Sequence, residues 1–341
     1  MALVYSGGVG HTTAPEADPG WDSVGKMSIG SGTYLGHGWV LAPYHVYSHN
    51  AATGSYIDLD QRYNGILGTA RRIEYSDTMD TDLVMFRIEG NPDLPEIRIS
   101  SSAPLGQEVT IIAAGRSQVG GLVDFGGGYI GFETDWRRAK RWGRNVTGSF
   151  VTSTSSSYGR TRSLTANFDS PGLGDDECQL VANDSGGSAF VEVSPGDWTL
   201  AGMALSVGTP GGYHGPNVVY NAVYGNHACY ADLSSYKSQI DAIRLMPLPG
   251  DADWDGDVDT SDIEIFKATF GRTGSDLQAD FNDDEIVDLK DFAIIRGHFG
   301  IVSGGELPGA EDLPVAVAPE PATILLLGVS GGVLLRSRRR R

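Results

Sequence analysis

The chain contains few cysteines and few positively charged residues, and both features limit the classes of protein to which it can belong. Its 341 residues include only Cys178 and Cys229, which excludes a disulfide-framework fold and leaves open whether one bridge forms. Lysine and arginine number 25 against 43 aspartates and glutamates, for a formal net charge of -18. Because such a surface repels phosphates and anionic lipids, we expect no nucleic acid partner, and calcium is the more natural partner of this acidity.

The N-terminal end lacks the basic start and the apolar stretch of a secretory signal. It reads Met-Ala-Leu-Val-Tyr-Ser-Gly-Gly, although the other end of the chain carries an export-type pattern. We therefore expect the true start of the protein to lie upstream of Met1, or Met1 to be an internal position.

Long helical patterns are scarce, whereas glycine is abundant. The 47 glycines and frequent Ser, Thr, Asn and Asp residues punctuate short apolar runs, which is typical of strands joined by turns. Runs of strand length occupy residues 38–42, 83–88 and 108–114. A helical pattern at 233–245 ends this region. The sequence thus predicts a mainly β body over residues 24–245.

The rest of the chain divides into shorter segments. Acidic residues from Asp251 onward recur at an offset of 29 residues, which indicates a duplicated module. A Gly/Pro/Glu-rich stretch follows that cannot bury a core, so it predicts a linker. The predicted boundaries are 1–23 for an N-terminal segment, 24–245 for the β body, 246–250 for a linker, 251–302 for the duplicated module, 303–316 for a flexible linker, and 317–341 for a short apolar run with an arginine tail.

The strongest single signal is the segment 183–188, Asn-Asp-Ser-Gly-Gly-Ser. A serine nucleophile needs a tight turn, small neighbours that admit the scissile carbonyl, and backbone N–H groups aimed at the oxyanion. The glycines after Ser185 supply that access. By itself, a Ser-Gly-Gly in so glycine-rich a chain predicts a plain turn more often than a catalytic one.

Two upstream motifs change that balance. An apolar strand delivers His45 at its end, and Asp82 directly precedes the strand 83–88. His37 and His49 are close to His45 in sequence, and Asp77 and Asp80 are close to Asp82. None of these four residues stands at the matching end of an apolar strand. With His, Asp and Ser in this order, residues 24–245 resemble the trypsin-like serine peptidases of the chymotrypsin fold.

The resemblance implies a two-barrel chymotrypsin-like fold with a C-terminal helix, and it implies roles for single residues. Ser185 would be the acylated nucleophile, His45 the general base, and Asp82 the group that fixes the imidazole tautomer. The backbone N–H groups of Asn183 and Ser185 match the oxyanion hole. The family usually has glycine where Asn183 stands, and asparagine is among the residues that best tolerate a positive φ.

The resemblance also implies a substrate-binding strand at residues 205–208, Leu-Ser-Val-Gly, which would pair with the backbone of a peptide. In that strand Ser206 would support the buried aspartate and Gly208 would form a wall of the specificity pocket. The pocket floor falls near Gln179, but its spacing to the serine differs from that of trypsin, so the P1 preference stays open.

Three other features keep alternatives open. The acidic run 175–177 fits a solvated loop better than a pocket rim, and the basic segment 136–144 fits a hairpin tip better than an anion site. Many family members insert a freshly cut N-terminus beside the aspartate that matches Asp184, and no such segment is recognisable. The need for activation by cleavage therefore stays open.

The duplicated module carries oxygen ligands at the spacing of a calcium loop. Its first copy has acidic residues at loop positions 1, 3, 5, 9 and 12 and glycine at position 6, with a backbone carbonyl at position 7. In the second copy Glu285 replaces the glycine, so we expect weaker binding of Ca²⁺. The predicted ligands are Asp251, Asp253, Asp255, Asp257, Asp259 and Asp262 in the first loop and Asp280, Asn282, Asp284, Ile286, Asp288 and Asp291 in the second.

Each loop runs into a short helix, and no convincing helix precedes it. Aspartate rather than glutamate stands at position 12 of both copies. This tandem over about 50 residues resembles type I dockerin. The resemblance implies a small α module that folds on calcium and docks onto a cohesin-like partner. A merely solvated acidic stretch is the alternative.

The C-terminal segment joins a Pro-Glu-Pro motif, a short apolar run and an arginine tail. The apolar run 324–335 predicts a short helix and falls below the ~20 residues of a stable spanning helix. Its basic end is favoured on the cytoplasmic side of a membrane. This layout resembles the PEP-CTERM sorting signal, which implies an exosortase-type partner and a bacterial cell-envelope or extracellular location with transient anchoring. An ordinary C-terminal anchor is the rival.

Together these patterns predict an exported serine endopeptidase that hydrolyses peptide bonds of a protein or peptide substrate through an acyl-enzyme. Ca²⁺ is expected in the dockerin-like loops, and none is needed for the peptide chemistry. The alternative is a catalytically silent, protease-like binding or scaffold protein recruited through its dockerin. A non-peptidic ester substrate also stays open.

Overall fold

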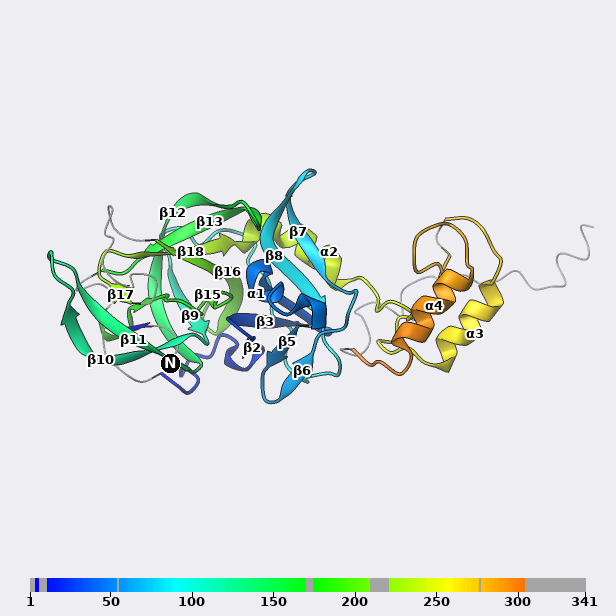
Figure 1. Cartoon of the computed structure of the whole chain (residues 1–341), viewed down its shortest axis with the longest axis horizontal. Coiled ribbons are helices and arrows are strands. Elements are labelled where there is room, and N and C mark those ends of the chain that lie inside the picture. Colours follow the sequence, from blue (N-terminus) through cyan, green and yellow to red (C-terminus); the bar gives the residue numbers. More distant parts are fainter. Residues whose placement is uncertain are drawn as a thin grey trace, which may run out of the picture. The chain divides into compact units, whose positions relative to one another are not determined.

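The computed structural model describes residues 4–5, 11–53, 55–169, 174–208, 221–275 and 277–303 (Figure 1). Contacts group the chain into Met1–Leu307 and Pro308–Arg341. The predicted sorting signal at 317–341, with its short apolar helix, lies outside the described residues. Within the part of the chain that is described, no helix combines the length and apolarity needed to cross a membrane.

The N-terminal half forms an antiparallel sheet with strand order β6-β5-β2-β3-β4-β8-β7. Its strands are β2 (Val24–Lys26), β3 (Ser31–Gly36), β4 (Trp39–Pro43), β5 (Tyr56–Asp58), β6 (Arg62–Asn64), β7 (Arg71–Ser76) and β8 (Met79–Arg87). The end of β6 returns to β8, because Ile66 N–H donates to the Arg87 carbonyl at 2.8 Å and Glu89 N–H to the Asn64 carbonyl at 2.9 Å. Six strands therefore curl into a first barrel, with β7 paired outside it.

The C-terminal half forms a closed antiparallel barrel with strand order β12-β13-β18-β16-β15-β9. Its strands are β9 (Glu108–Ala113), β12 (Arg141–Ser155), β13 (Gly159–Asn167), β15 (Ser188–Ser194), β16 (Asp197–Gly208) and β18 (His227–Asp232). A register shift between Ala204 and Ser206 marks a bulge in β16. The closed order gives every strand two neighbours, although the end of β16 beyond Met203 pairs with β18 alone.

Smaller elements complete the β body. Two minor sheets and six short helices are described: β1 (Val4–Tyr5) with β14 (Cys178–Gln179); β10 (Arg116–Asp124) with β11 (Ile130–Arg138) and β17 (Ala222–Val223); η1 (Trp21–Ser23), α1 (Tyr44–Tyr47), η2 (Ala51–Thr53), η3 (Gly174–Asp176), η4 (Leu233–Tyr236) and α2 (Lys237–Arg244). The predicted helix at 233–245 thus consists of η4 followed by α2.

The two barrels share one apolar core. Leu41 and Met85 of the first barrel belong to the same buried cluster as Ile112 and Phe190 of the second, and Ile240 of α2 packs there too. Burying each such side chain contributes about 1.5–3 kcal/mol relative to exposure, so the halves are held as one body. This is the mainly β, two-barrel chymotrypsin-like fold, with the predicted C-terminal helix.

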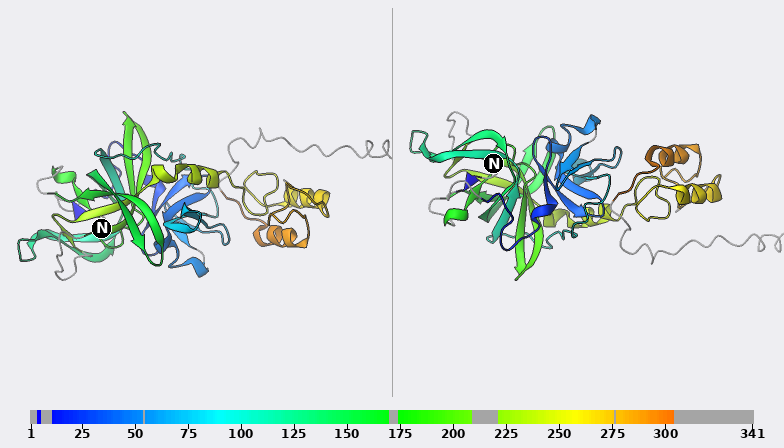
Figure 2. Two further views of the ribbon diagram at one scale, coloured as in Figure 1. Left: turned by 90° about the horizontal axis from the view of Figure 1, so that it is seen from above. Right: turned by 90° about the horizontal axis from the view of Figure 1, so that it is seen from below.

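The duplicated module folds into two loop-helix units. Each loop leads into one helix, α3 (Thr260–Thr269) or α4 (Leu289–His298), and the two helices lie side by side in every view (Figures 1 and 2). Val258 and Phe266 of the first unit pack with Val287 and Ile295 of the second. These pairs stand 29 residues apart, so both copies bury the same positions. The short helices therefore depend on each other for burial.

Candidate active site

His45 and Asp82 meet where strand β4 ends. Pro43 has φ -64° and, lacking an N–H, ends the strand so that His45 falls on the short helix α1. Because Pro43 pairs with Leu83, the end of β4 lies beside Asp82. The His45 ring Nδ1 is 2.6 Å from Asp82 Oδ2, and the His45 backbone N–H donates to Asp82 Oδ1 at 2.9 Å. One aspartate thus fixes both the backbone and the ring of the histidine. The other ring nitrogen, Nε2, is left to accept a proton.

The second barrel supports this pair through its β12-β13 hairpin. The Asp82 backbone N–H donates to Thr161 Oγ1 at 2.9 Å. The ring of Tyr158 lies 5.7 Å from the imidazole of His45. No sequence pattern singled out Thr161, because the contact joins residues 79 positions apart.

Ser185 lies in a turn that packs against the first barrel. Ser31 N–H donates to the Ser185 carbonyl at 2.7 Å. Gly186 has φ +84°, and a Cβ there would collide with the Ser31 carbonyl and come within 3.0 Å of Pro43 Cδ. Only glycine fits this conformation and this gap. The turn therefore sits against the strand end that carries His45.

The Ser185 hydroxyl donates to the Leu205 carbonyl at 3.5 Å, a long hydrogen bond. Among the described residues it makes no hydrogen bond to the His45 imidazole. Catalytic hydrogen bonds are often long or poorly aligned before substrate binds and tighten in the complex. The serine side chain must therefore rotate away from Leu205 before its hydroxyl can bond to the His45 imidazole.

The backbone around Ser185 presents unpaired donors. The N–H groups of Asp184, Gly186 and Gly187 donate to protein carbonyls, whereas those of Asn183 and Ser185 have no acceptor among the described residues. Asn183 adopts φ +72°, as asparagine tolerates, and its side-chain amide donates to the Ile29 carbonyl at 2.8 Å. Two free N–H groups on one turn are what an oxyanion hole consists of.

A cavity of ≈ 320 Å³ adjoins Asp82 and the strand segment 205–208. Gly208 lines it, and a Cβ at that position would collide with the His227 ring. Ser206, which was predicted to support Asp82, is exposed and lines the same cavity as Asp82, but in the described part of the chain no hydrogen bond joins the two side chains.

Gln179 is fully buried in β14, opposite Val4. Both polar atoms of its side-chain amide lack a hydrogen-bond partner among the described residues. Residues 170–173 and 209–220 are outside the description, and the assignment of Gln179 to the pocket floor stays a prediction. Cys178 and Cys229 are free thiols, and burial raises the pKa of each.

Two of the competing candidates have other partners, and two are exposed. His37 pairs with Glu96 at 3.8 Å and Asp80 pairs with Arg72 at 3.3 Å, whereas His49 and Asp77 are exposed.

One interpretation of surface charge is wrong, and another is wrong for one residue. In the acidic run 175–177, Glu177 is buried and accepts the Asp169 N–H at 2.7 Å. The basic segment 136–144 is no hairpin tip, because β11 and β12 belong to different sheets. Arg138 and Lys140 turn inward to backbone carbonyls, since each carbonyl offers a hydrogen bond that offsets the cost of partial burial.

Neither protein-family models nor curated protein sequences match this chain. Among solved structures, it is similar to a crystal structure of the Rv3671c protease in an inactive form, with 12% identity, a TM-score of 0.37, and coverage of 65% of this chain and 89% of that one. A serine-to-alanine variant of Rv3671c from M. tuberculosis H37Rv gives 12% identity, a TM-score of 0.39, and coverage of 71% and 98%. At such scores the likeness carries no weight for activity, and the fold assignment rests on strand order.

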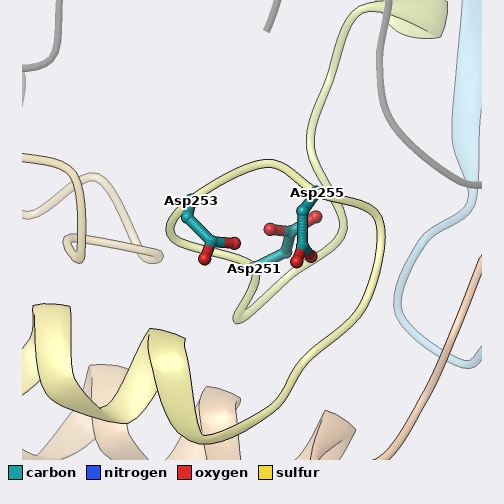
Figure 3. A group of neighbouring side chains, drawn as sticks. All are labelled: Asp251, Asp253 and Asp255. Carbon is teal, nitrogen blue, oxygen red and sulfur yellow. The ribbon is translucent and has the colours of Figure 1, made fainter. Parts of the chain in front are cut away.

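The first loop of the module gathers its carboxylates into two groups. Figure 3 shows Asp251, Asp253 and Asp255 turned toward one another from one loop. Carboxylate oxygens of each group lie within 4.8 Å of one another, and the second group is Asp257, Asp259 and Asp262. Burial, with the nearby charges of Asp262 and Asp255, raises the pKa of Asp251 to about 7. One carboxylate oxygen of Asp257 is buried without a hydrogen-bond partner in the described chain.

These observations fit a hard cation that takes carboxylate oxygens, as Ca²⁺ does. Part of the same set also serves the fold. Asp259 and Asp262 form a capping box at the start of α3, with Asp262 accepting the Asp259 N–H at 2.7 Å. Asp288 and Asp291 do the same for α4.

The second loop differs from the first in two respects. Glu285 adopts φ +63°, a conformation that Gly256 reaches in the first loop without a Cβ. The Lys290 ammonium lies 2.6 Å from Asp284 Oδ2, so a protein cation already neutralises a predicted ligand. Two further predicted side-chain ligands, Asp280 and Asn282, accept the backbone N–H of Asp284 in their own loop.

Proposed function

We propose that the chain is a serine endopeptidase. The observation that carries the proposal is the imidazole of His45 held by Asp82 at the strand end against which the Ser185 turn packs. Ser185 Oγ attacks the peptide carbonyl while His45 Nε2 takes its proton, and the N–H groups of Asn183 and Ser185 bind the oxyanion. The C–N bond then breaks as His45 protonates the leaving amine. Water, deprotonated by His45, releases the acid from the acyl-enzyme.

An edge of β16 suits an extended peptide substrate. Strand β15 pairs with β16 only as far as Met203, and Ala204 N–H donates to the Gly187 carbonyl at 2.8 Å. Beyond that point residues 206–208 pair with β18 on one side, and their other side carries no strand among the described residues. A peptide can add there as a strand and bring its scissile bond to Ser185. This edge favours a peptide over a small ester.

The test is cleavage of a peptide library by the full chain beside Ser185→Ala and His45→Ala. We expect the wild type to cut with a definable P1 preference and both variants to be inactive. Equal cleavage by wild type and Ser185→Ala would end the proposal. A folded wild type that cuts nothing would favour the alternative, a protease-like scaffold protein.

We further propose that the first loop of the module holds Ca²⁺ and that the module docks onto a cohesin-like partner. When bound, the ion would offset the repulsion among Asp251, Asp253 and Asp255 and tie the loop to α3. Phe270, Leu289 and Phe299 expose half or more of their side chains, as a docking surface would. Export and processing by an exosortase-type enzyme are proposed from the C-terminal sequence pattern alone.

Calcium binding is tested by circular dichroism of the metal-free full chain during a Ca²⁺ titration. We expect the helical signal to rise with one dominant transition, and Asp251→Asn to weaken it far more than Asp280→Asn. A signal that Ca²⁺ leaves unchanged would contradict the proposal.

A further inference from the structure

Arg138, at the end of β11, makes a set of contacts that the proposed triad does not use. Its guanidinium donates to four backbone carbonyls: from Nε to Ala114 at 2.9 Å, from Nη1 to Met27 at 3.0 Å and Ser28 at 2.9 Å, and from Nη2 to Gly30 at 2.5 Å. Arginine carries its donors in a rigid fork, so one side chain can hold two chain segments at a set distance. Here the segments are the loop 27–30 and the end of β9.

The loop 27–30 touches the serine turn directly. The Ile29 carbonyl accepts the side-chain amide of Asn183 at 2.8 Å. Directly after the loop, Ser31 N–H donates to the Ser185 carbonyl at 2.7 Å. The loop thus holds both residues whose N–H groups would bind the oxyanion.

The segment after β9 touches the same turn from another side. Gly115 follows Ala114, and a Cβ at Gly115 would collide with the carboxylate of Asp184. Ala114 N–H also donates to Ser31 Oγ at 2.9 Å, which joins the two segments to each other. The serine turn therefore packs between the loop 27–30 and the segment 114–115, and the guanidinium of Arg138 is hydrogen-bonded to both segments.

Asp184 adds a reason for a positive charge at this place. Its side chain is fully buried and accepts the Val181 N–H at 2.8 Å. A buried carboxylate is costly unless hydrogen bonds and an opposite charge compensate it. Burial lowers the pKa of Arg138, and the charge of Asp184 counteracts that lowering, so the two groups lie within electrostatic reach.

We propose that Arg138 is a positioning residue for the oxyanion hole, an inference that rests on the proposed peptidase function. It fixes the loop 27–30 and the segment 114–115 around the serine turn and offsets the charge of Asp184. The N–H groups of Asn183 and Ser185 thereby stay aimed at one point. Arg138 acts through these two segments, since in the described residues it makes no hydrogen bond to Ser185 or His45.

The test compares Arg138→Lys and Arg138→Met with Arg137→Met in the full chain. Arg137 is the matched control, because it is the next residue along and its exposed side chain pairs with Asp135. We expect Arg138→Met to lower kcat about 10²-fold, the cost of a small misplacement of catalytic groups. The kcat of Arg138→Lys should lie between the values of the wild type and of Arg138→Met, because one ammonium group cannot bond to four carbonyls. KM should stay within about two-fold, since the strand 205–208 is untouched.

Two further readouts separate positioning from loss of fold. Affinity for a peptide boronate, which places an anionic oxygen in the hole, should fall in step with kcat/KM. In the double variant Arg138→Met/Asp184→Asn, kcat should recover part of the loss, because no buried negative charge then lacks the nearby positive charge of Arg138. Near-ultraviolet circular dichroism checks that each variant is folded, and Arg138→Lys carries the test if Arg138→Met does not fold.

A folded Arg138→Lys with the wild-type kcat and boronate affinity would overturn the inference, as would a raised KM with kcat unchanged. A wild type that neither cuts peptides nor binds the boronate would instead overturn the peptidase proposal, and this inference with it. Intact wild-type activity beside unaffected Arg138 variants would overturn only the inference.

Discussion

The first barrel presents His45 already bonded to Asp82 through two hydrogen bonds, whereas the second presents Ser185 with its hydroxyl turned to Leu205. The difference follows from how each side chain is held. The aspartate stands on β8 and the histidine on α1, directly after β4, so the pairing of β4 with β8 sets their distance. Ser185 stands on a turn, and its place depends on the loop 27–30 across the barrel interface. The base is built into one sheet, while the nucleophile relies on packing between two.

The largest effect should come from the pair inside the first barrel. Asp82→Asn keeps the shape of the side chain but removes the charge that fixes the imidazole tautomer, so we expect kcat to fall about 10⁴-fold. Steady-state cleavage of a peptide chosen from the library measures this. A loss of kcat smaller than ten-fold in folded Asp82→Asn would mean that His45 and Asp82 do not act together in catalysis.

The next largest effect should come from the turn of the second barrel. Gly186→Ala puts a Cβ against the Ser31 carbonyl at φ +84°, so we expect kcat/KM to fall about 10²-fold through misplacement of Ser185. Gly196→Ala is the matched control, because Gly196 has φ +78° with open space around its Cβ position. The control should lose about 1 kcal/mol of stability and keep its kcat/KM. Equal kinetic losses in both variants would contradict this explanation.

A smaller effect should come from the contact that joins the barrels at Asp82. Thr161→Val removes the acceptor of the Asp82 N–H, which leaves a partly buried donor unpaired at a cost of about 1 kcal/mol. We expect kcat to fall about ten-fold. Thr165→Val, on the same strand, should leave kcat unchanged. Identical kinetics of the two variants would show that Thr161 does not support the pair.

The smallest effect on catalysis should come from calcium. None of the twelve predicted ligands belongs to either barrel. A chelator should therefore lower the helical signal of the module and change the rate of peptide cleavage less than about two-fold. A large loss of cleavage on chelation, reversed by Ca²⁺, would mean that the barrels alone do not make the site.

Much of the fold was predictable from local patterns. Apolar runs of strand length gave β4, β8 and β9, and the repeat at 29 residues gave the paired helices. His45 and Asp82 were found because each stands at the end of such a run. Local patterns suffice where side chains are placed by the strand that carries them.

Contacts between distant segments were not predictable. The bonds of Thr161 to Asp82 and of Asn183 to Ile29 join residues 79 and 154 positions apart. The bulge between Ala204 and Ser206 was not predictable from the apolar pattern of the strand either, because a bulge adds one residue without changing the composition. Arg138 was read as a surface charge, since composition does not say which guanidinium turns inward.

The central claim is that Ser185 is a nucleophile activated by His45. The most direct measurement is treatment of the full chain with a fluorophosphonate, followed by intact mass and peptide mapping. The account predicts a single adduct on Ser185, formed rapidly in the wild type and lost in His45→Ala. No adduct, an adduct on another residue, or equal labelling of His45→Ala would contradict it.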